Sequence, residues 1–427
     1  MLASTFRLVI RLHLKLPPES FPGFVPEFAS RDRSPYHLEG KLRMVNETLK
    51  LKNIGPIAEA DVQFGDLTVL VGPQATGKSI FLQFLKLVLD ARPIAGFFTE
   101  HGLNWRRDLT SFLELYVGEG AGSLWQPGRS EIRWHGSSVD LDALVKSKKQ
   151  GGAEKSFLIP AQRVLAFSRN GWFRPFNDYN AGDPFSVRDF SEKLRRLMES
   201  NGDRHQSIYP QDGRLQAEIH DLLSTSIFGG FHLELDKKGP QKRLVLHGNG
   251  TQIPYMVWSA GQREFVPLLL GLYWLLPAKP KRFGSIEWVM IEELEMGLHP
   301  KAIAAMFFLV LELMWRGYRV CLSTHSPQVL DLVWVFQSLR GRSADPKKIL
   351  SIFDVKSTPF TIKLVKAGLT KTAKVYYFDP ESRTTRDISS LDPAAVEQVE
   401  SGWGGLTELS GRVADMVAEA AGSDRDR

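Results

Sequence analysis

The segment GPQATGKS, Gly72 to Ser79, joins the apolar stretch Leu67–Val71 to the helix-forming sequence SIFLQFLKLVLD. It fits the pattern G-x-x-x-x-G-K-[ST], with a strand before it and a helix after it, which is the setting this pattern requires. Its glycines let the loop wrap so that backbone N–H groups point inward at phosphates. We therefore expect Lys78 to neutralise the outer phosphates of ATP and Ser79 to hold Mg²⁺. The residues expected to contact the nucleotide are Gly72, Pro73, Gln74, Ala75, Thr76, Gly77, Lys78 and Ser79.

Two further strand-like segments end in polar residues. VMIEELEMGLHP (Val289–Pro300) is an apolar strand followed by Glu292 and Glu293. Near a nucleotide, Glu292 is expected to lie beside Mg²⁺ and Glu293 to orient or deprotonate water. A solvated turn would show the same residues, but their place downstream of a phosphate loop favours a site. LSTHSPQ places His325 at the end of another strand, where it is expected to reach the γ-phosphate or the attacking water, although a lone histidine there is more often structural.

A second anion-binding pattern precedes an apolar helix. VWSAGQRE (Val257–Glu264) presents a hydroxyl, bare backbone and an amide at the start of FVPLLLGLYWLL, and a helix N-terminus attracts anions. The loop, the carboxylates and the histidine already surround one face of a nucleotide. We therefore expect Ser259, Gly261 and Gln262 to bind the phosphate of a neighbouring copy of the chain.

Composition and charge set the class of protein. The chain has 427 residues, of which 43% are hydrophobic and 24% charged, as in a folded soluble protein of two or three lobes. Cys321 is the only cysteine, so disulfides and cysteine-based metal sites are excluded and a cytoplasmic location fits. The apolar runs are interrupted or too short to span a bilayer. The net charge of +6 permits an acidic partner, although a solvated surface explains it equally simply.

The order of the segments GPQATGKS, WSAGQ, MIEELE and STHS resembles that of Walker A, signature, Walker B and switch-histidine motifs in ABC-type ATPase heads of the AAA family. GLHP and STHSPQVLD are similar to the subgroup of RecF, SMC-like and OLD-type ATPases. The resemblance implies ATP sandwiched between two heads, with Lys78 and Glu293 from one and Ser259 and Gly261 from the other. It also implies that Gln162, in FLIPAQR, links Mg²⁺ and water; a surface amide beside a core strand is the alternative.

The chain departs from the family pattern at two positions. Glu292 stands where the family has Asp, and its longer side chain is expected to crowd the Mg²⁺ shell and slow hydrolysis. Ala260 replaces a glycine of the signature, which is a small change. Neither departure removes ATP binding from the prediction.

The alternation of strands and helices predicts an α/β fold, a P-loop NTPase of the ABC-head type, with a largely parallel sheet, an antiparallel β part and a small helical insert at about 186–228. Residues 1–43 are expected to be a loose or non-native extension, with Met44 as the natural start. The head is expected at 44–335. Residues 336–427 are expected to hold further strands, including 348–355 and 358–368, and a helix with a frayed tail.

Only 102 residues follow His325, without an acidic triad at strand ends, so we expect any Toprim nuclease to be a separate chain. The chain thereby resembles the ATPase subunit of the PARIS phage-defence system, also in the segments IPAQRV, GWFRPFNDY and RDFSEKLR. This resemblance implies a homo-oligomeric ATPase scaffold that holds a separate effector nuclease. The scaffold would release it on sensing an acidic phage protein that mimics DNA. The aromatic loop 167–179 is either a partner surface or a packed lid over the sheet.

Two other functions stay open. A RecF-like DNA-binding ATPase in repair would use the basic pairs and clusters Arg106–Arg107, Arg195–Arg196, Lys279–Arg282 and Arg340–Lys348, which are more simply solvated charge. A structural oligomer locked by ATP would hardly turn over. A transporter engine is disfavoured, because its signature follows Walker A more closely and no membrane domain is visible.

Overall fold

The central sheet is built around β3 (Leu67–Val71), the apolar stretch before the phosphate loop, whose five residues are all buried. Parallel neighbours extend it on both sides, β13 (Ala373–Phe378) on one side and, on the other, β12 (Arg319–Ser323), β11 (Trp288–Ile291) and β6 (Ser156–Ile159). A short antiparallel strand, β14 (Thr385–Asp387), completes the sheet beside β13. The fold is therefore α/β with a largely parallel sheet, as the sequence predicts.

The computed structural model describes residues 47–147, 151–169, 171–202, 207–210, 215–236, 242–277 and 281–423. Asn46–Arg427 forms one compact unit. The predicted extension at 1–43 and the proposed start at Met44 lie outside the described residues. None of the helices in the described parts of the chain is both long and apolar enough to cross a bilayer.

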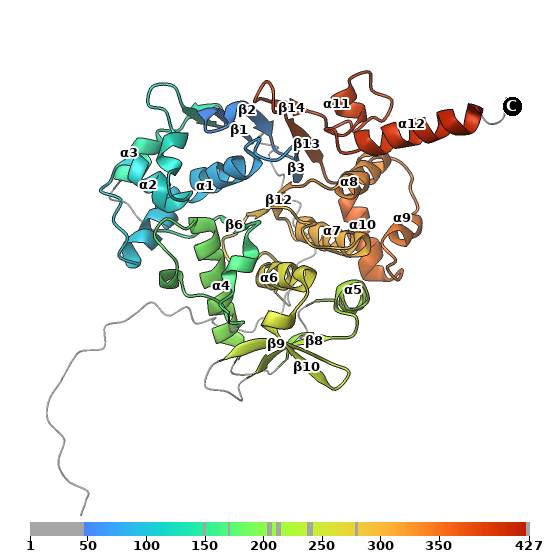
Figure 1. Cartoon of the computed structure of the whole chain (residues 1–427), viewed down its shortest axis with the longest axis horizontal. Coiled ribbons are helices and arrows are strands. Elements are labelled where there is room, and N and C mark those ends of the chain that lie inside the picture. Colours follow the sequence, from blue (N-terminus) through green and yellow to red (C-terminus); the bar gives the residue numbers. More distant parts are fainter. Residues whose placement is uncertain are drawn as a thin grey trace, which may run out of the picture. The chain divides into compact units, whose positions relative to one another are not determined.

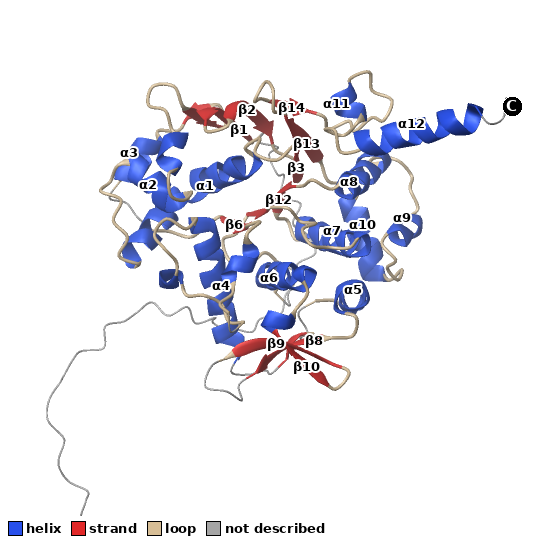
Figure 2. Cartoon of the chain, in the orientation of Figure 1, coloured by secondary structure: helices blue, strands red, loops and turns tan. Residues whose placement is uncertain are grey.

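Helices cover both faces of the sheet because side chains alternate between two cores (Figures 1 and 2). Leu70, Met290 and Cys321 face the core of α1 (Lys78–Glu100), α2 (Leu109–Tyr116) and α3 (Leu141–Lys146). Cys321 is thus the small core residue that the sequence predicts. Val69 and Val289 face the opposite core. The helices of that core are α4 (Phe185–Gly202), α5 (Ala217–Leu223), α6 (Ala260–Leu275), α7 (Pro300–Trp315), α8 (Pro327–Leu339), α9 (Pro346–Ile352) and α10 (Pro359–Gly368).

Two smaller antiparallel sheets flank this layer. One has the order β2 (Ile57–Gln63), β1 (Thr48–Ile54), β4 (Glu131–Trp134) and β5 (Ser137–Ser138). The other has the order β10 (Thr251–Pro254), β9 (Arg243–Gly248), β8 (His232–Asp236) and β7 (Ser207–Tyr209), and it lies below α6 in Figure 1. The stretch 186–228 therefore contains a strand, β7, besides its predicted helices.

Two predicted strands are wrong, because 348–355 falls mainly on α9 and 358–368 on α10. Their apolar content suits either structure, and the residues that precede them select the helix. Asp345 caps α9 and Thr358 caps α10, and each cap is followed by a proline in the first turn. Two helices near the end of the chain are α11 (Gln398–Ser401) and α12 (Glu408–Ser423).

Most aromatic side chains of the loop 167–179 are packed in the interior. Phe167, Phe173, Phe176 and Tyr179 are each at most 9% exposed. The guanidinium of Arg174 lies 3.8 Å from the ring centroid of Tyr179. These aromatic rings are thus packed, as the lid alternative predicts.

Candidate functional site

The phosphate loop connects β3 to α1 through backbone conformations that require glycine. Gly72 and Gly77 have φ angles of +138° and +99°. A Cβ atom on Gly72 would lie 2.6 Å from the carbonyl oxygen of Phe378, and one on Gly77 would lie 2.6 Å from a side-chain carbon of Ile57. Residues of β13 and β2 thus pack so closely on the loop that only glycine fits at these two positions.

Lys78 is the first residue of α1 and is only 6% exposed. Its ammonium donates to the carbonyl oxygens of Gly72, at 2.8 Å, and Pro73, at 2.7 Å. Burial lowers the pKa of Lys78 to about 8, although Glu293 and Glu295 act to raise it. The loop's own carbonyl groups therefore hold a cation at the position where a phosphate would be neutralised.

Glu292 follows β11 and is 3% exposed. Its Oε2 accepts a hydrogen bond of 2.9 Å from the amide of Ala161, at the end of β6, while Oε1 is buried without a partner among the described residues. Burial raises the pKa of the carboxyl group; the Ala161 amide and the Ser79 hydroxyl act in the opposite direction. A carboxylate that is near Ser79 and has one oxygen without a partner fits a Mg²⁺ ligand.

Ser79 and Glu292 offer a hydroxyl and a carboxylate, which are oxygen ligands of the kind that Mg²⁺ binds. Within the described ranges, no group of three or more His, Cys, Asp or Glu side chains is arranged to hold a metal ion. Mg²⁺ commonly binds one or two protein oxygens together with substrate phosphates and water. Ser79 and Glu292 are the residues that would hold it here.

Glu293 has a φ angle of +47°, which is unusual for a glutamate. Its amide donates to the Ser323 carbonyl, at 3.1 Å, and lies 3.3 Å from the Ser323 hydroxyl. Strained conformations held by their neighbours are concentrated at functional sites. The Nε2 atom of His325 lies 3.9 Å from Oε1 of Glu293. Burial, followed by the charge of Lys78, lowers the pKa of His325, which favours its neutral form.

Lys78, Ser79, Glu293 and His325 line one cavity of about 460 Å³. The loop residues Gln74 to Ser79, Glu293, Ser323 and His325 form its polar lining. Pro56, Ile80 and Leu124 form an apolar part, suited to the base of a nucleotide. Sequence reasoning missed Ser323, although it lies in the quoted segment STHS, and neither Pro56 nor Leu124 has a sequence signal.

Several predicted site residues are not part of the cavity lining. Glu292 is one of them, together with Gly72 and Pro73 at the start of the loop. Among the described residues that line the cavity, Gln162, Ser259, Gly261 and Gln262 are not included. Gln162 is exposed, directly after Ala161, whose amide binds Glu292. The structure thus brings Gln162 to the same edge of the sheet as the carboxylates without placing its side chain in the cavity.

The signature segment, Ser259–Gln262, begins α6. Ser259 and Gln262 form a capping box, with hydrogen bonds of 3.2 and 2.9 Å between each side chain and the backbone N–H of the other. A Cβ atom on Gly261 would lie 2.6 Å from the carbonyl oxygen of Gly297, in the loop after Glu293. Gly261 is therefore required by packing within the chain, whatever it binds outside it.

Arg163 is a site residue that sequence reasoning missed. It is completely buried and donates to the carbonyl oxygens of Glu264 (3.0 Å), Glu292 (2.9 Å) and Glu293 (3.0 Å). Burial lowers its pKa from the ordinary value, and nearby carboxylates, Glu264 first, act to raise it. Its position directly after Gln162 was the available signal.

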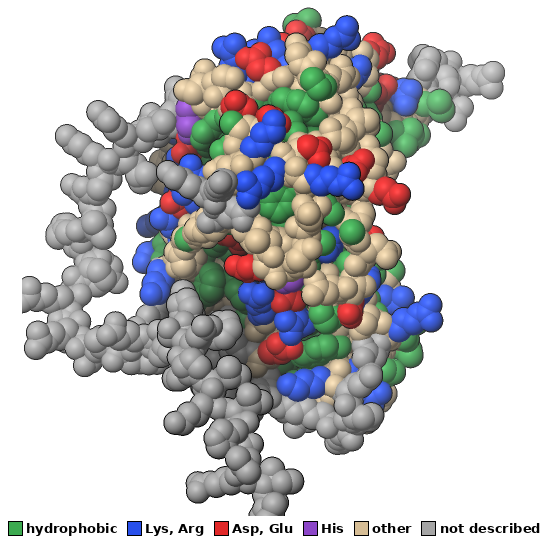
Figure 3. All heavy atoms as spheres, turned by 90° about the vertical axis from the view of Figure 1, so that its left-hand side faces the viewer, with side chains coloured by type: hydrophobic (Ala, Val, Ile, Leu, Met, Phe, Trp, Pro, Cys, Tyr) green, Lys and Arg blue, Asp and Glu red, His purple; other side chains and the backbone are tan. Residues whose placement is uncertain are grey.

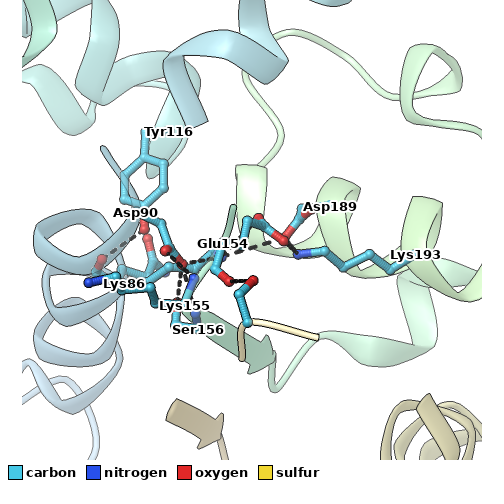
Figure 4. Close-up of polar contacts among 10 residues, drawn as sticks. Lys86, Asp90, Tyr116, Glu154, Lys155, Ser156, Asp189 and Lys193 are labelled. Atoms are coloured by element: carbon cyan, nitrogen blue, oxygen red, sulfur yellow. Dashed lines mark hydrogen bonds and ion pairs between the residues drawn. The ribbon is translucent and has the colours of Figure 1, made fainter. Parts of the chain in front are cut away.

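A buried ion network fixes α1 against β6 and α4 (Figure 4). The ammonium of Lys86 is fully buried, 3.5 Å from Oδ2 of Asp90, 3.6 Å from Oε1 of Glu154 and 3.8 Å from Oδ2 of Asp189. Asp90 also accepts hydrogen bonds from the backbone of Lys155, at 2.7 Å, and Ser156, at 3.1 Å. The helix that starts at the phosphate loop is thereby tied to the strand that ends beside Glu292.

Residues 146–331 match the family described as an AAA domain, a putative AbiEii toxin of a type IV toxin–antitoxin system. No curated protein matches the sequence. The chain is similar to the solved SMC head domain from Thermotoga maritima, with 14% identity and a TM-score of 0.30 over 66% of this chain and 90% of that one. It is also similar to an SMC head bound to the C-winged helix domain of ScpA, with 10% identity and a TM-score of 0.37 over 66% and 90% of the two chains. A third similar structure is a dimeric post-hydrolysis state of the ATP-binding cassette MJ0796 bound to ADP and Pi, with 13% identity and a TM-score of 0.31 over 66% and 89%.

The AAA match runs from the approach to β6 into α8. It includes Ser259, Glu292, Glu293 and His325. The match covers less than half of the chain, and it likens this part to an AAA domain.

Proposed function

We propose that the chain binds ATP with Mg²⁺ in the cavity beside the phosphate loop and hydrolyses it to ADP and phosphate. The observation that carries this proposal is that Lys78, Glu293 and His325, from three separate segments, line one cavity. Lys78 neutralises the outer phosphates, and Glu293 orients water and accepts its proton. Neutral His325 lies near Glu293 and holds the water or the γ-phosphate. Mg²⁺, held by Ser79 and Glu292, supplies further charge neutralisation when bound.

ATP is sandwiched between two copies of the chain in this proposal. Ser259 is exposed at the N-terminus of α6 and, with Gly261 and Gln262, is available to a second nucleotide. Met256 and Val257, immediately before the signature segment, are 57% and 69% exposed. Apolar side chains beside an anion-binding helix terminus suit a surface that is covered when two heads pair. We propose Gln162 as an additional contact to Mg²⁺ and water.

The cellular role that we propose is that of a cytoplasmic, homo-oligomeric scaffold in phage defence. It would hold a separate Toprim-type effector nuclease and release it on sensing an acidic, DNA-mimicking phage protein. The likeness to the PARIS ATPase subunit supports this role, and the net charge of +6 is compatible with an acidic partner.

DNA binding in repair is the second candidate, favoured by the basic clusters of the sequence. In the structure, Arg195 and Arg196 both pair with Glu192 on their own helix. Basic and acidic side chains are interspersed over the face shown in Figure 3. Lys279–Arg282 lies partly outside the described residues. Charge already paired within the chain is less available to phosphates, so we rank this candidate second.

The first test of function compares ATP binding and turnover in the unaltered chain and in Glu293→Gln. We expect Glu293→Gln to bind a fluorescent ATP analogue normally and to release phosphate at least ~100-fold more slowly, as loss of a general base implies. Equal, near-zero turnover in both would instead support an oligomer locked by ATP.

A second experiment separates the cellular roles. The tagged protein is purified from its native host in ATP, and bound protein and nucleic acid are both quantified. A stoichiometric second protein with nuclease motifs supports the defence scaffold. Nuclease-sensitive DNA, a steep salt dependence of DNA affinity and no fixed protein partner would support the repair ATPase.

A further inference from the structure

Arg163 connects the two halves of the proposed ATP sandwich within one chain. Each of its three guanidinium nitrogens donates to a backbone carbonyl group. The acceptors belong to Glu264 in α6 and to the consecutive residues Glu292 and Glu293 after β11. The Nε atom of Arg163 also lies 3.5 Å from the carboxylate of Glu264. One rigid, planar group therefore spans the signature helix and the carboxylate segment.

Space filling alone does not explain this residue. Removing a guanidinium from water is costly, and an apolar side chain of similar volume commonly serves a core at least as well. What an apolar side chain cannot do is to hold several acceptors at fixed angles, which the planar fork of arginine does. Two of those acceptors are the carbonyl groups of Glu292 and Glu293, so the guanidinium constrains the backbone that carries the proposed Mg²⁺ ligand and base.

A second contact joins the same two regions. Gly261, in the signature segment, packs so closely on Gly297 that a Cβ atom would lie 2.6 Å from its carbonyl oxygen. A movement of the first turns of α6 is therefore transmitted to the segment 292–297 at two points. Only the contact through Arg163 acts directly on Glu292 and Glu293.

We propose that Arg163 is a positioning residue that couples engagement of the signature helix by a second copy's ATP to the placement of Glu293 in its own site. Glu293 adopts its strained backbone only while its neighbours hold it, and Arg163 is one of those neighbours. Hydrolysis is thereby linked to pairing of the heads. This inference rests on the proposed ATPase function.

The kinetic test uses Arg163→Lys, which keeps the charge but loses the planar fork. We expect kcat for ATP to fall at least tenfold, while KM and the affinity for a fluorescent ATP analogue change less than threefold. Arg188→Lys is the matched control, because Arg188 is only 2% exposed and packs on the ring of Phe176, at 3.9 Å. That variant is expected to keep kcat. An unchanged kcat in Arg163→Lys, with an active unaltered protein, overturns the inference and leaves the proposed function standing.

The second test does not depend on turnover, because it uses the Glu293→Gln background. Hydrogen exchange is measured by mass spectrometry with and without ATP. We expect ATP to protect residues 260–265 and 291–297 from exchange. When Arg163→Lys is introduced into the same background, we expect residues 291–297 to lose this protection and residues 260–265 to keep it. Retained protection of both segments overturns the coupling, even if the unaltered protein proves inactive.

Folding of the variants is checked by thermal unfolding. If Arg163→Lys does not fold, Glu264→Gln replaces it, because it removes the carboxylate beside the guanidinium without changing size. We expect Glu264→Gln to lower kcat with unchanged ATP affinity, and an unchanged kcat overturns the inference. Absence of ATP binding by the unaltered protein overturns this inference and the proposed function together.

Discussion

At the scale of the residue, Glu292 shows what one additional methylene group does. The sequence predicts that a glutamate here crowds the Mg²⁺ shell. In the structure, the longer side chain lets Oε2 reach the amide of Ala161 at 2.9 Å, across to the neighbouring strand. The other oxygen remains without a partner among the described residues and is the one that fits the metal. The additional length thus anchors the carboxylate, which the sequence comparison with Asp does not reveal.

We therefore predict that Glu292→Asp, although it restores the family pattern, destabilises the protein. The shorter side chain withdraws from Ala161 and leaves a partly buried amide without its acceptor, which costs about 1–3 kcal/mol of unfolding free energy. Urea unfolding measures this cost. Glu292→Gln is the control, since it keeps the reach and should keep most of the stability while losing the Mg²⁺ dependence of ATP binding. A Glu292→Asp protein as stable as the unaltered one would contradict this account.

At the scale of the element, two polar contacts set the positions of the central strands and of α1. Lys86 ties α1 to β6 and α4, as described above. Asp66 ties the start of β3 to the start of β13, because it accepts hydrogen bonds from the amide of Thr372, at 2.9 Å, and from its hydroxyl, at 3.0 Å. Both contacts join segments that the phosphate loop depends on.

We predict that Lys86→Met lowers the unfolding free energy by about 3–5 kcal/mol, because it leaves buried carboxylates without their central cation. Chemical denaturation measures the loss. Lys193→Met is the matched control: Lys193 also pairs with Glu154 and Asp189, but its side chain is 15% exposed, so water can replace part of the interaction. Equal losses in the two variants would show that burial of Lys86 has no special effect.

The contact between Asp66 and Thr372 leads us to predict how the stability of the fold depends on pH. Burial alone would raise the pKa of Asp66, but the Thr372 amide and the Lys371 ammonium outweigh it, so the pKa in the folded chain lies below its ordinary value. Its stabilising contribution is therefore present above the unfolded pKa, near ~4, and is lost as the pH falls through the folded value. Asp66→Asn should cost about 1–2 kcal/mol at neutral pH and progressively less at acid pH.

Urea unfolding of Asp66→Asn at neutral and acid pH tests this sign. Asp415→Asn is the control, because Asp415 is exposed on α12 and the change should be nearly neutral at both values. A cost for Asp66→Asn that grows as the pH falls would be the wrong sign for a carboxyl group with a lowered pKa.

At the scale of the whole molecule, the nucleotide cavity and the signature segment are separate features of one chain. The residues that line the cavity do not, among those described, include the start of α6. In the proposed ATP sandwich, a second copy supplies its signature segment to this cavity. The exposed Met256 and Val257 are then covered by the pairing.

We predict that Val257→Asp abolishes ATP-dependent pairing of the Glu293→Gln protein without changing the ATP affinity of the single chain. A charge beside the signature segment opposes both burial and the approach of a partner's phosphates. Light scattering with ATP and Mg²⁺ measures the doubling of mass. Ile352→Asp is the control, because Ile352 is 48% exposed at the end of α9 and should leave pairing intact. Undiminished pairing of Val257→Asp would place the interface elsewhere.

Sequence reasoning works for the parts of the site that are local in the chain. The phosphate loop, Glu293 and His325 each follow an apolar strand in the sequence, and the structure brings them to one cavity. The carboxyl ends of parallel strands lie at one edge of a sheet, which explains why these segments meet. The identity of α9 and α10 was missed, although Asp345, Pro346, Thr358 and Pro359 carry a capping signal that apolar content alone obscures. In those two segments the capping residue and the proline after it, and not the apolar content, select a helix over a strand.

The sequence alone establishes the loop, the order of the polar strand ends and the α/β class, since short segments encode them in backbone and periodicity. Only the tertiary structure decides that Arg163 reaches Glu292 and Glu293, 129 and 130 residues away, or that Asp66 meets Thr372, 306 residues away. No sequence spacing predicts such contacts, because the folding of the chain, and not local periodicity, brings the partners together. The physical reason is that a buried polar group needs a partner, and the fold determines which one lies within reach.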